Sequence, residues 1–251
     1  MGTDTSWQEH YINRFYRSSR GWTNGTRDFH DLCSRSISPG ARVLEIGAGP
    51  SNHTSKFLSK HFQLFGADVS DEAQANDALR EFRKIGASGQ IPYPDGSFDA
   101  CVSDYVLEHV DDPSRHFQEV LRLLGPNGVY VFRTPNRNHY VSAISAMTSH
   151  GFHKRVANWS RALPPDAHEP WPTRYRCNTV GAVLKQAIAH KFYVEVLDSV
   201  EKEPSYARFS RLAFLLGVAY ERVVNSSESF EPLRSNLFTV LRTTRTEFTL
   251  S

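Results

Sequence analysis

Short apolar runs alternate with amphipathic stretches between residues 41 and 134. Four apolar runs predict buried strands, at residues 41–47, 63–68, 98–104 and 128–134. Amphipathic stretches between them predict helices at residues 56–60, 71–84 and 113–124, the last opened by an Asp112-Pro113 cap. The regular alternation predicts a further strand between residues 84 and 91. Strands that alternate with helices in this way indicate a parallel sheet with helices on both faces.

The pattern breaks after Thr134. Residues 137–177 contain four prolines and little periodicity, which predicts an inserted cap. Regular elements then return, and we expect a helix from Asn178 to about residue 190, a strand at 192–200, a helix at 205–224 and a closing strand at 236–241. The predicted fold is α/β, with a mostly parallel seven-stranded sheet.

The domain organisation follows from these elements. Residues 1–40 carry aromatic residues at helical spacing, including Trp7, Tyr11 and Phe15, and we expect them to form an N-terminal helical lid. Residues 41–251 form the main domain, with the cap at 137–177 and a helical insertion at 205–224. We expect that helix to pack on the sheet or to form a homodimer contact. Its arginines, Arg208 and Arg211, leave a membrane-surface role open.

Composition narrows the class of protein. The chain has 251 residues, of which 39% are hydrophobic and 22% charged, as in a folded globular protein. The net charge of +2 comes without a basic run, so we expect no nucleic-acid partner. The start of the chain has no apolar signal segment, and the longest apolar run, 212–220, is too short to span a bilayer. We therefore expect a cytoplasmic protein without stable membrane insertion, its three scattered cysteines reduced.

The clearest motif is Val43-Leu-Glu-Ile-Gly-Ala-Gly-Pro-Ser-Asn52, in which a buried strand turns through Gly47, Ala48 and Gly49 into a helix. Glycines at such a turn let a ligand approach the backbone closely, at the strand ends where these sheets bind ligands. A dinucleotide-binding motif would have a third glycine at position 52. Asn52 at that position, and the carboxylate of Glu45, favour a cationic ligand group over a pyrophosphate.

Four further motifs follow in order: Ile91-Pro-Tyr-Pro-Asp-Gly-Ser-Phe-Asp99, Leu107-Glu-His-Val-Asp-Asp-Pro113, Leu124-Gly-Pro-Asn-Gly128 and Arg133-Thr-Pro-Asn-Arg-Asn138. Together with the glycine turn they resemble the class I S-adenosylmethionine-dependent methyltransferases, in their type 11, UbiE/UbiG-like small-molecule branch. The resemblance covers about residues 41–138 and implies a Rossmann-like fold and S-adenosylmethionine as cofactor.

The resemblance also implies roles for single residues. Glu45, Gly47, Ala48 and Gly49 would line the cofactor, and Asp68, at the end of the second strand, would accept hydrogen bonds from the ribose hydroxyls. Val69, Ser88 and Asp104 complete the expected cofactor contacts. One departure concerns adenine, because Ala87 stands where the family usually has an acid. Ser88 or the backbone would then serve the adenine.

Candidate acceptor and proton-transfer residues come from the less regular segments. His168 lies in a proline- and aromatic-rich part of the cap, and His109 follows the fourth strand, so each is a candidate general base, with a structural role for His109 as the alternative. Tyr11, Tyr175 and Arg176 are candidate contacts for a small-molecule acceptor. We expect no metal, because the Glu108-His109 pair lacks the first acid of a metal-binding ExxEH pattern.

These features predict an enzyme that transfers a methyl group from S-adenosylmethionine to a small-molecule acceptor, at oxygen. Two alternatives remain. A binding module that has lost activity would explain Ala87, and an NAD-dependent oxidoreductase would share the sheet but fits the motifs poorly. Binding of S-adenosylhomocysteine without turnover would identify the first alternative, and preference for NADH would identify the second.

Overall fold

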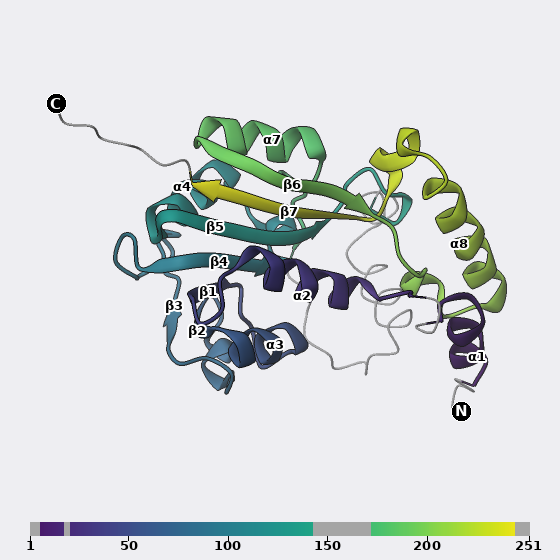
Figure 1. Ribbon diagram of the computed structural model, residues 1–251, viewed down its shortest axis with the longest axis horizontal. Coiled ribbons are helices and arrows are strands. Elements are labelled where there is room, and N and C mark those ends of the chain that lie inside the picture. Colours follow the sequence, from purple (N-terminus) through teal and green to yellow (C-terminus); the bar gives the residue numbers. More distant parts are fainter. Residues whose placement is uncertain (1–5, 18–20, 143–171, 244–251) are drawn as a thin grey trace. The chain divides into compact units, whose positions relative to one another are not determined.

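The computed structural model describes residues 6–17, 21–142 and 172–243 (Figure 1). The chain divides into two compact units. The sheet unit comprises residues 29–135, 173–198 and 237–251, and the helical unit comprises residues 1–28, 136–172 and 199–236. The predicted boundaries of lid, cap and helical insertion stay predictions.

A seven-stranded sheet in the order β3-β2-β1-β4-β5-β7-β6 organises the fold. β3, β2, β1, β4 and β5 pair with one another in parallel. The strands are β1 (Arg42–Ile46), β2 (Gln63–Asp68), β3 (Phe82–Lys84), β4 (Phe98–Asp104), β5 (Leu124–Pro135), β6 (Phe192–Val200) and β7 (Asn236–Thr243). The α/β, Rossmann-like fold with a mostly parallel seven-stranded sheet is therefore confirmed.

The α-helices of the described residues are α1 (Ser6–Phe15), α2 (Gly25–Ser36), α3 (His53–His61), α4 (Pro113–Leu123), α7 (Val180–Ala189) and α8 (Arg211–Val224). α4 begins as the sequence predicts, because the Asp112 side chain accepts a hydrogen bond from the backbone N–H of Arg115 and Pro113 opens the first turn. Phe117, packed in the sheet unit's core, is fully buried, and the three free cysteines are buried as well.

One predicted helix is wrong. Residues 71–84 form the short 3₁₀ helix η2 (Asp71–Ala75), a turn and the edge strand β3. The backbone N–H of Arg80 donates to the Leu64 carbonyl, and that of Gly66 donates to the Glu81 carbonyl. Pairing with β2 therefore overrides the helical pattern of this stretch, and β3 lies earlier than the strand expected between residues 84 and 91.

The helical unit has an aromatic core. α8 packs against α1, beside which it lies in Figure 1, through a cluster of Trp7, Tyr11, Ile12, Phe15, Tyr16, Trp22, Phe214 and Val218. The predicted helix 205–224 is shorter than expected: residues 205–207 form the 3₁₀ helix η4 (Ser205–Ala207), and α8 starts after the Ser210 cap. The 3₁₀ helix η5 (Glu228–Leu233) follows α8.

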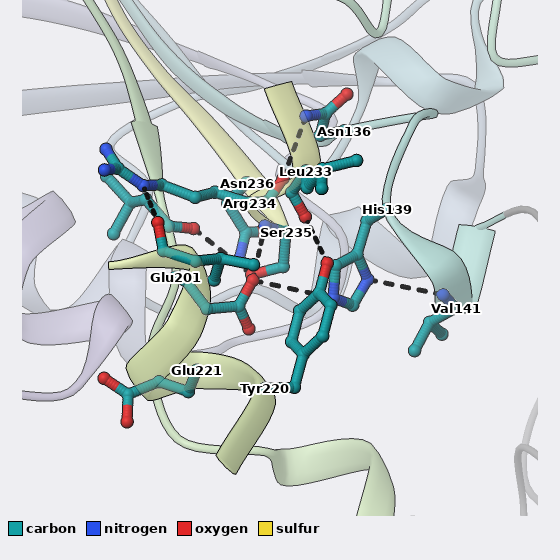
Figure 2. Close-up of polar contacts among 12 residues, drawn as sticks. Asn136, His139, Val141, Glu201, Tyr220, Glu221, Leu233, Arg234, Ser235 and Asn236 are labelled. Carbon is teal, nitrogen blue, oxygen red and sulfur yellow. Dashed lines mark hydrogen bonds and ion pairs between the residues drawn. The ribbon is translucent and has the colours of Figure 1, made fainter. Parts of the chain in front are cut away.

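A buried polar cluster lies in the same unit (Figure 2). The Asn136 side chain donates to the carbonyls of Pro232 and Arg234, at 2.9 and 2.8 Å. The backbone N–H of Ser235 donates to Glu201 Oε2 at 2.7 Å. These bonds join the segments after β5, β6 and η5, so Asn136, part of the Arg133–Asn138 motif, has a structural role in this unit.

Candidate functional site

Three predicted acids end up at one edge of the sheet. Asp68 and Asp104 are the last residues of β2 and β4, and Glu45 is the penultimate residue of β1. In the parallel register Glu45 pairs with Gly66 on one side and with Val102 on the other. The carboxyl ends of β1, β2 and β4 therefore meet at the edge where open α/β sheets bind ligands.

The glycine turn leads from this edge into α3. Gly47 has φ +73° and donates its backbone N–H to the Ala67 carbonyl at 2.7 Å. A Cβ on Gly47 would lie 2.4 Å from Val106 Cγ2, whereas a Cβ on Gly49, at φ +52°, would meet no heavy atom within 4 Å. Both positions need glycine for their backbone conformation, but only Gly49 borders open space. Ala48 between them is fully buried.

Asn52, at the third glycine position of dinucleotide-binding proteins, has a different task here. Its side-chain oxygen accepts hydrogen bonds from the backbone N–H groups of Thr54 and Ser55, at 2.8 and 2.9 Å, and so caps α3. Its amide also donates to the Ala48 carbonyl at 3.0 Å. The helix N-terminus is thus closed by a side chain of the protein, which argues against a pyrophosphate at this helix end.

Asp68 is held by the backbone around it. Its Oδ2 accepts from the Gly49 N–H at 2.9 Å and its Oδ1 from the Ser70 N–H at 2.7 Å. Each carboxylate oxygen keeps a further lone pair. The side chain is thus fixed in orientation and still able to accept two hydrogen bonds from a diol.

Glu45 is a buried carboxylate with one strong partner. Ser55 Oγ donates to its Oε2 at 2.8 Å. Burial raises the pKa of Glu45 to about 8, and the nearby charges of Asp104 and Asp68 add to that rise, against the lowering effect of Ser55. Such a carboxylate is stabilised by a cationic ligand group.

Asn76 holds the glycine turn from the side, and sequence reasoning missed it. Its buried amide donates to the Ala48 and Gly49 carbonyls at 3.3 and 3.2 Å, and to Ser55 Oγ at 3.1 Å. The residue lies in the stretch that was predicted as helix, so its turn position carried no signal.

Asp104 is already engaged inside the sheet unit. Arg133 binds it with two nitrogens, Nε to Oδ1 at 2.5 Å and Nη2 to Oδ2 at 2.9 Å, and Thr54 Oγ1 donates to Oδ2 at 2.7 Å. His30 Nε2 in turn lies 3.1 Å from Thr54 Oγ1. Desolvation, and then the charge of Arg133, lower the pKa of His30. The predicted cofactor contact of Asp104 stays a prediction, beside this structural role.

The residue after Asp104 is strained. Tyr105 adopts φ +58°, in the left-handed region that a bulky residue rarely occupies. Arg133 Cζ lies 4.6 Å from the centroid of its ring. Strain of this kind concentrates at functional sites. The β4–β5 register pairs Asp104, the residue before Tyr105, with Arg133, and nothing in the sequence marks this arrangement.

Val69 and Ser88 differ in their surroundings. Val69, next to Asp68, leaves 51% of its surface exposed, so it offers an apolar surface at the ligand edge. Ser88 lies on an exposed turn, where its Oγ accepts from the backbone N–H of Gln90 at 3.3 Å. The adenine contact of Ser88 stays a prediction.

Three of the predicted acceptor-side residues come together after β4. His109 closes the 3₁₀ helix η3 (Leu107–His109), with Nε2 3.9 Å from Oε1 of the buried Glu108. The Tyr175 N–H donates to the Glu108 carbonyl at 3.1 Å, and Arg176 lies 3.7 Å from Asp111. Val106, whose side chain a Cβ on Gly47 would strike, immediately precedes this segment.

Two other candidates, Tyr11 and His168, stay predictions. Tyr11 packs its ring in the aromatic core of the helical unit, 5.8 Å from the ring of Phe214. His168 lies outside the described residues. Among the described residues, no three histidine, cysteine, aspartate or glutamate side chains gather closely enough to hold a metal ion. Within the same ranges no helix has the length and apolar character needed to cross a bilayer.

The donor set of this edge fits S-adenosylmethionine. Asp68 offers two acceptors for a ribose diol, and Glu45 offers a buried carboxylate for a cationic ligand. The space beside Gly49 allows close approach to the backbone. At the position where the resemblance expects an acid for the adenine amino group, this chain has Ala87.

Comparison with known proteins agrees with this geometry. A family model described as a methyltransferase domain matches residues 44–132. An uncharacterized methyltransferase from Mycobacterium sp. (strain KMS) is 38% identical over 97 residues, which are 37% of this chain and 38% of that protein. A demethylmenaquinone methyltransferase from Mycolicibacterium vanbaalenii is 29% identical over 142 residues, 52% of this chain and 60% of that protein. The chain thus matches less than two thirds of the length of either.

A solved structure shows the same fold over nearly the whole chain. It is an S-adenosylmethionine-dependent methyltransferase from Thermotoga maritima, described as a possible histamine N-methyltransferase, with a TM-score of 0.53, 16% identity and coverage of 96% of both chains. Residues 44–132 of this chain match the methyltransferase domain, and the fold over nearly the whole chain is that of the solved S-adenosylmethionine-dependent methyltransferase.

Proposed function

We propose that this protein transfers the methyl group of S-adenosylmethionine to an oxygen atom of a small-molecule acceptor. The observation that carries the proposal concerns Gly49, which has a positive φ and open space at its Cβ position. Gly49 lies beside the Asp68 carboxylate, which accepts hydrogen bonds from the backbone around it. The Gly49 N–H holds Asp68 Oδ2 at 2.9 Å, so the turn and the acid are built as one unit. A diol-bearing nucleoside fits that unit, and a pyrophosphate does not.

Within this site each residue has a distinct task. Asp68 accepts the ribose hydroxyls, and the exposed side chain of Val69 packs against the adenine. Glu45 supplies negative charge for the methionine ammonium group. Ser88 and Asp104 are the remaining proposed contacts, with Asp104 held in place by Arg133.

The cofactor, when bound, supplies an activated methyl group on a sulfonium ion, so the protein needs mainly to bind, orient and exclude water. An acceptor hydroxyl must lose a proton, and His109 is the proposed base for it. Its side chain is about one third exposed, and its Nε2 lies 3.9 Å from Oε1 of the buried Glu108. Tyr175 and Arg176, on the segment hydrogen-bonded to Glu108, are the proposed acceptor contacts.

The nature of the acceptor is part of the proposal. The named relative, a demethylmenaquinone methyltransferase, supports a small molecule. The net charge of +2, without a basic run, gives no support to a nucleic acid. Arg176, with a side chain 59% exposed and Asp111 as its partner, is suited to bind an acidic group of the acceptor. The predicted contacts of Tyr11 and His168 are kept as further candidates.

Turnover of a hydroxyl acceptor tests the proposal. The full chain is incubated with S-adenosylmethionine and a panel of phenols, quinols, carboxylates and amines, and release of S-adenosylhomocysteine is measured. On the best hydroxyl acceptor, His109→Gln should lower kcat about 100-fold or more while the cofactor Kd stays unchanged. His61→Gln, on an exposed histidine at the far end of α3, is the matched control.

The outcome separates the parts of the proposal. Methylation of amines alone would refute transfer to oxygen. An unchanged kcat for His109→Gln would remove His109 as the base. Tight S-adenosylhomocysteine binding with no turnover of any acceptor would refute catalysis and favour a binding module.

A further inference from the structure

Helix α8 has two apolar faces, although a helix packed on a single partner needs only one. Its inner face is buried, with Phe214 and Val218 packed among the aromatic residues of α1. Its outer face is exposed: Leu212 leaves 68% of its surface accessible, Leu216 63% and Val223 54%. Leu212 and Leu216 therefore lie on the side of α8 that is left open.

The exposed residues form a continuous stripe. At about 100° per residue, Leu212, Leu215, Leu216, Ala219 and Val223 fall within an arc of about 100°, and Phe214 and Val218 lie outside this arc. We call these five residues the outer stripe. Eleven large apolar side chains are exposed in the described ranges, and eight of them lie in the helical unit: Tyr140, Phe209, Leu212, Leu215, Leu216, Val223, Phe230 and Leu233. Four of these eight belong to the outer stripe, so the exposed apolar side chains of α8 are concentrated on one face of the helix.

The charges beside the outer stripe are basic. Arg211 and Arg222 lie along one flank of it, at the two ends of α8. Arg211 stacks over Trp7 at 6.0 Å and makes no ion pair within the described residues. Arg222 Nε lies 3.4 Å from Glu221, the only acid of α8, which is itself buried. The nearest exposed acid in sequence, Glu228, comes after the helix has ended.

We propose that the outer stripe of α8 binds the surface of an anionic lipid bilayer. A helix that lies in the bilayer interface has this design, with aliphatic residues toward the acyl chains and arginines at the level of the headgroups. Phe209 before α8 and Phe230 after it are exposed as well. Lipid binding by this stripe does not depend on methyl transfer.

A second copy of the chain fits the same surface poorly. Two stripes packed antiparallel would place Arg211 of one copy beside Arg222 of the other. Glu221 points into the unit, where it accepts a hydrogen bond from Tyr16, and so does not reach across such an interface. An anionic partner would face Arg211, which makes no ion pair within the described residues, without this repulsion.

Vesicle co-sedimentation tests the proposal. The full chain is mixed with vesicles of phosphatidylcholine alone or of phosphatidylcholine with about one third phosphatidylglycerol. We expect binding to the anionic vesicles, weakened by high salt and at least about tenfold weaker for the double variant Leu212→Glu/Leu216→Glu. Ile188→Glu, which changes an apolar residue of α7 that is 74% exposed, is the matched control and should bind as the wild type does. Circular dichroism and thermal unfolding confirm that each variant is folded.

Three results would overturn the proposal. The first is no binding of the wild type to anionic vesicles. The second is equal binding by the folded double variant. The third is a wild-type dimer in sedimentation velocity that the double variant converts to monomer, because the stripe would then be a self-association surface. Loss of methyl transfer without loss of vesicle binding would leave lipid binding standing and would count against the proposed function alone.

Discussion

His139 Nε2 lies 3.5 Å from Glu201 Oε2, and both side chains are buried in the polar cluster of the helical unit (Figure 2). Desolvation shifts the pKa values of the two residues in opposite directions. It lowers the pKa of His139 to about 4 and raises the pKa of Glu201 to about 7. The neutral forms of both are therefore favoured near neutral pH, and the contact is not an ion pair of fixed charge.

The two shifts predict opposite pH dependences of stability. The stabilising contribution of Glu201 to the free energy of unfolding is present below its unfolded pKa, about 4.5, and is lost as the pH rises through about 7. The contribution of His139 is present above about 6.5 and is lost as the pH falls through about 4. Each pKa unit corresponds to about 1.4 kcal/mol, so each residue alone contributes on the order of 3 kcal/mol.

Urea unfolding between about pH 4.5 and 7.5 checks this. Relative to the wild type, Glu201→Gln should gain stability as the pH rises, and His139→Gln should lose it. In the wild type the two effects largely offset each other. Parallel pH profiles for both variants would show that the two groups do not titrate as the structure implies.

Glu45 predicts proton release when the cofactor binds. Its pKa of about 8 in the free protein should fall when a cationic group comes close, so cofactor affinity should rise with pH up to about 8. Titration calorimetry near pH 7 in two buffers of different ionisation enthalpy measures the protons released. Glu45→Gln should release fewer protons than the wild type. Equal release by the two proteins would mean that Glu45 does not face the cofactor.

Substitutions of Gly49 and Gly47 should cause different defects in stability and in cofactor binding. Gly49→Ala should cost about 1–2 kcal/mol of stability, from its positive φ, and weaken cofactor binding at least tenfold, because its Cβ enters the open space. Gly47→Ala should cost more stability, because its Cβ would strike Val106, and Val106→Ala should recover part of the loss. Thermal unfolding and calorimetry together distinguish the two. Normal cofactor affinity in Gly49→Ala would place the ligand elsewhere.

The Asp104–Arg133 pair predicts a stability defect. Asp104→Ala leaves the buried Arg133 without its partner and should cost about 3–5 kcal/mol. The double variant Asp104→Asn/Arg133→Met should recover much of that stability. Denaturant unfolding checks both. If Asp104→Ala were as stable as the wild type but bound the cofactor weakly, Asp104 would act at the cofactor and not in the pair.

The strands of the sheet's first half could be predicted because their residues are apolar on both faces and end in glycine or an acid. β2 and β4 have the predicted bounds, and the Asp112-Pro113 cap starts α4. The edge strand β3 could not be predicted, because its three residues are polar or charged except Phe82 and gain their structure from pairing with β2.

The residues of the candidate site also fall into some that could be predicted from the sequence and some that could not. Residues carried by the strand ends, such as Glu45 and Asp68, could be predicted, since strand order brings those ends together. Asn76 and the Asp104–Arg133 pair could not, because they depend on a turn geometry and on the β4–β5 register. The exposed face of α8 could not be predicted for another reason. When a helix has apolar residues on both sides, the sequence pattern does not tell which side is buried.

Titration of the full chain with S-adenosylhomocysteine tests the central claim most directly. We predict binding at one site, with Asp68→Ala weaker by about 1–3 kcal/mol, which is about 5- to 150-fold in Kd. Asp71→Ala, three residues on and with a side chain 72% exposed, should bind as the wild type does, and NADH should not compete. Tighter binding of NADH than of S-adenosylhomocysteine, or an unchanged Kd for Asp68→Ala, would contradict the assignment of this site to S-adenosylmethionine.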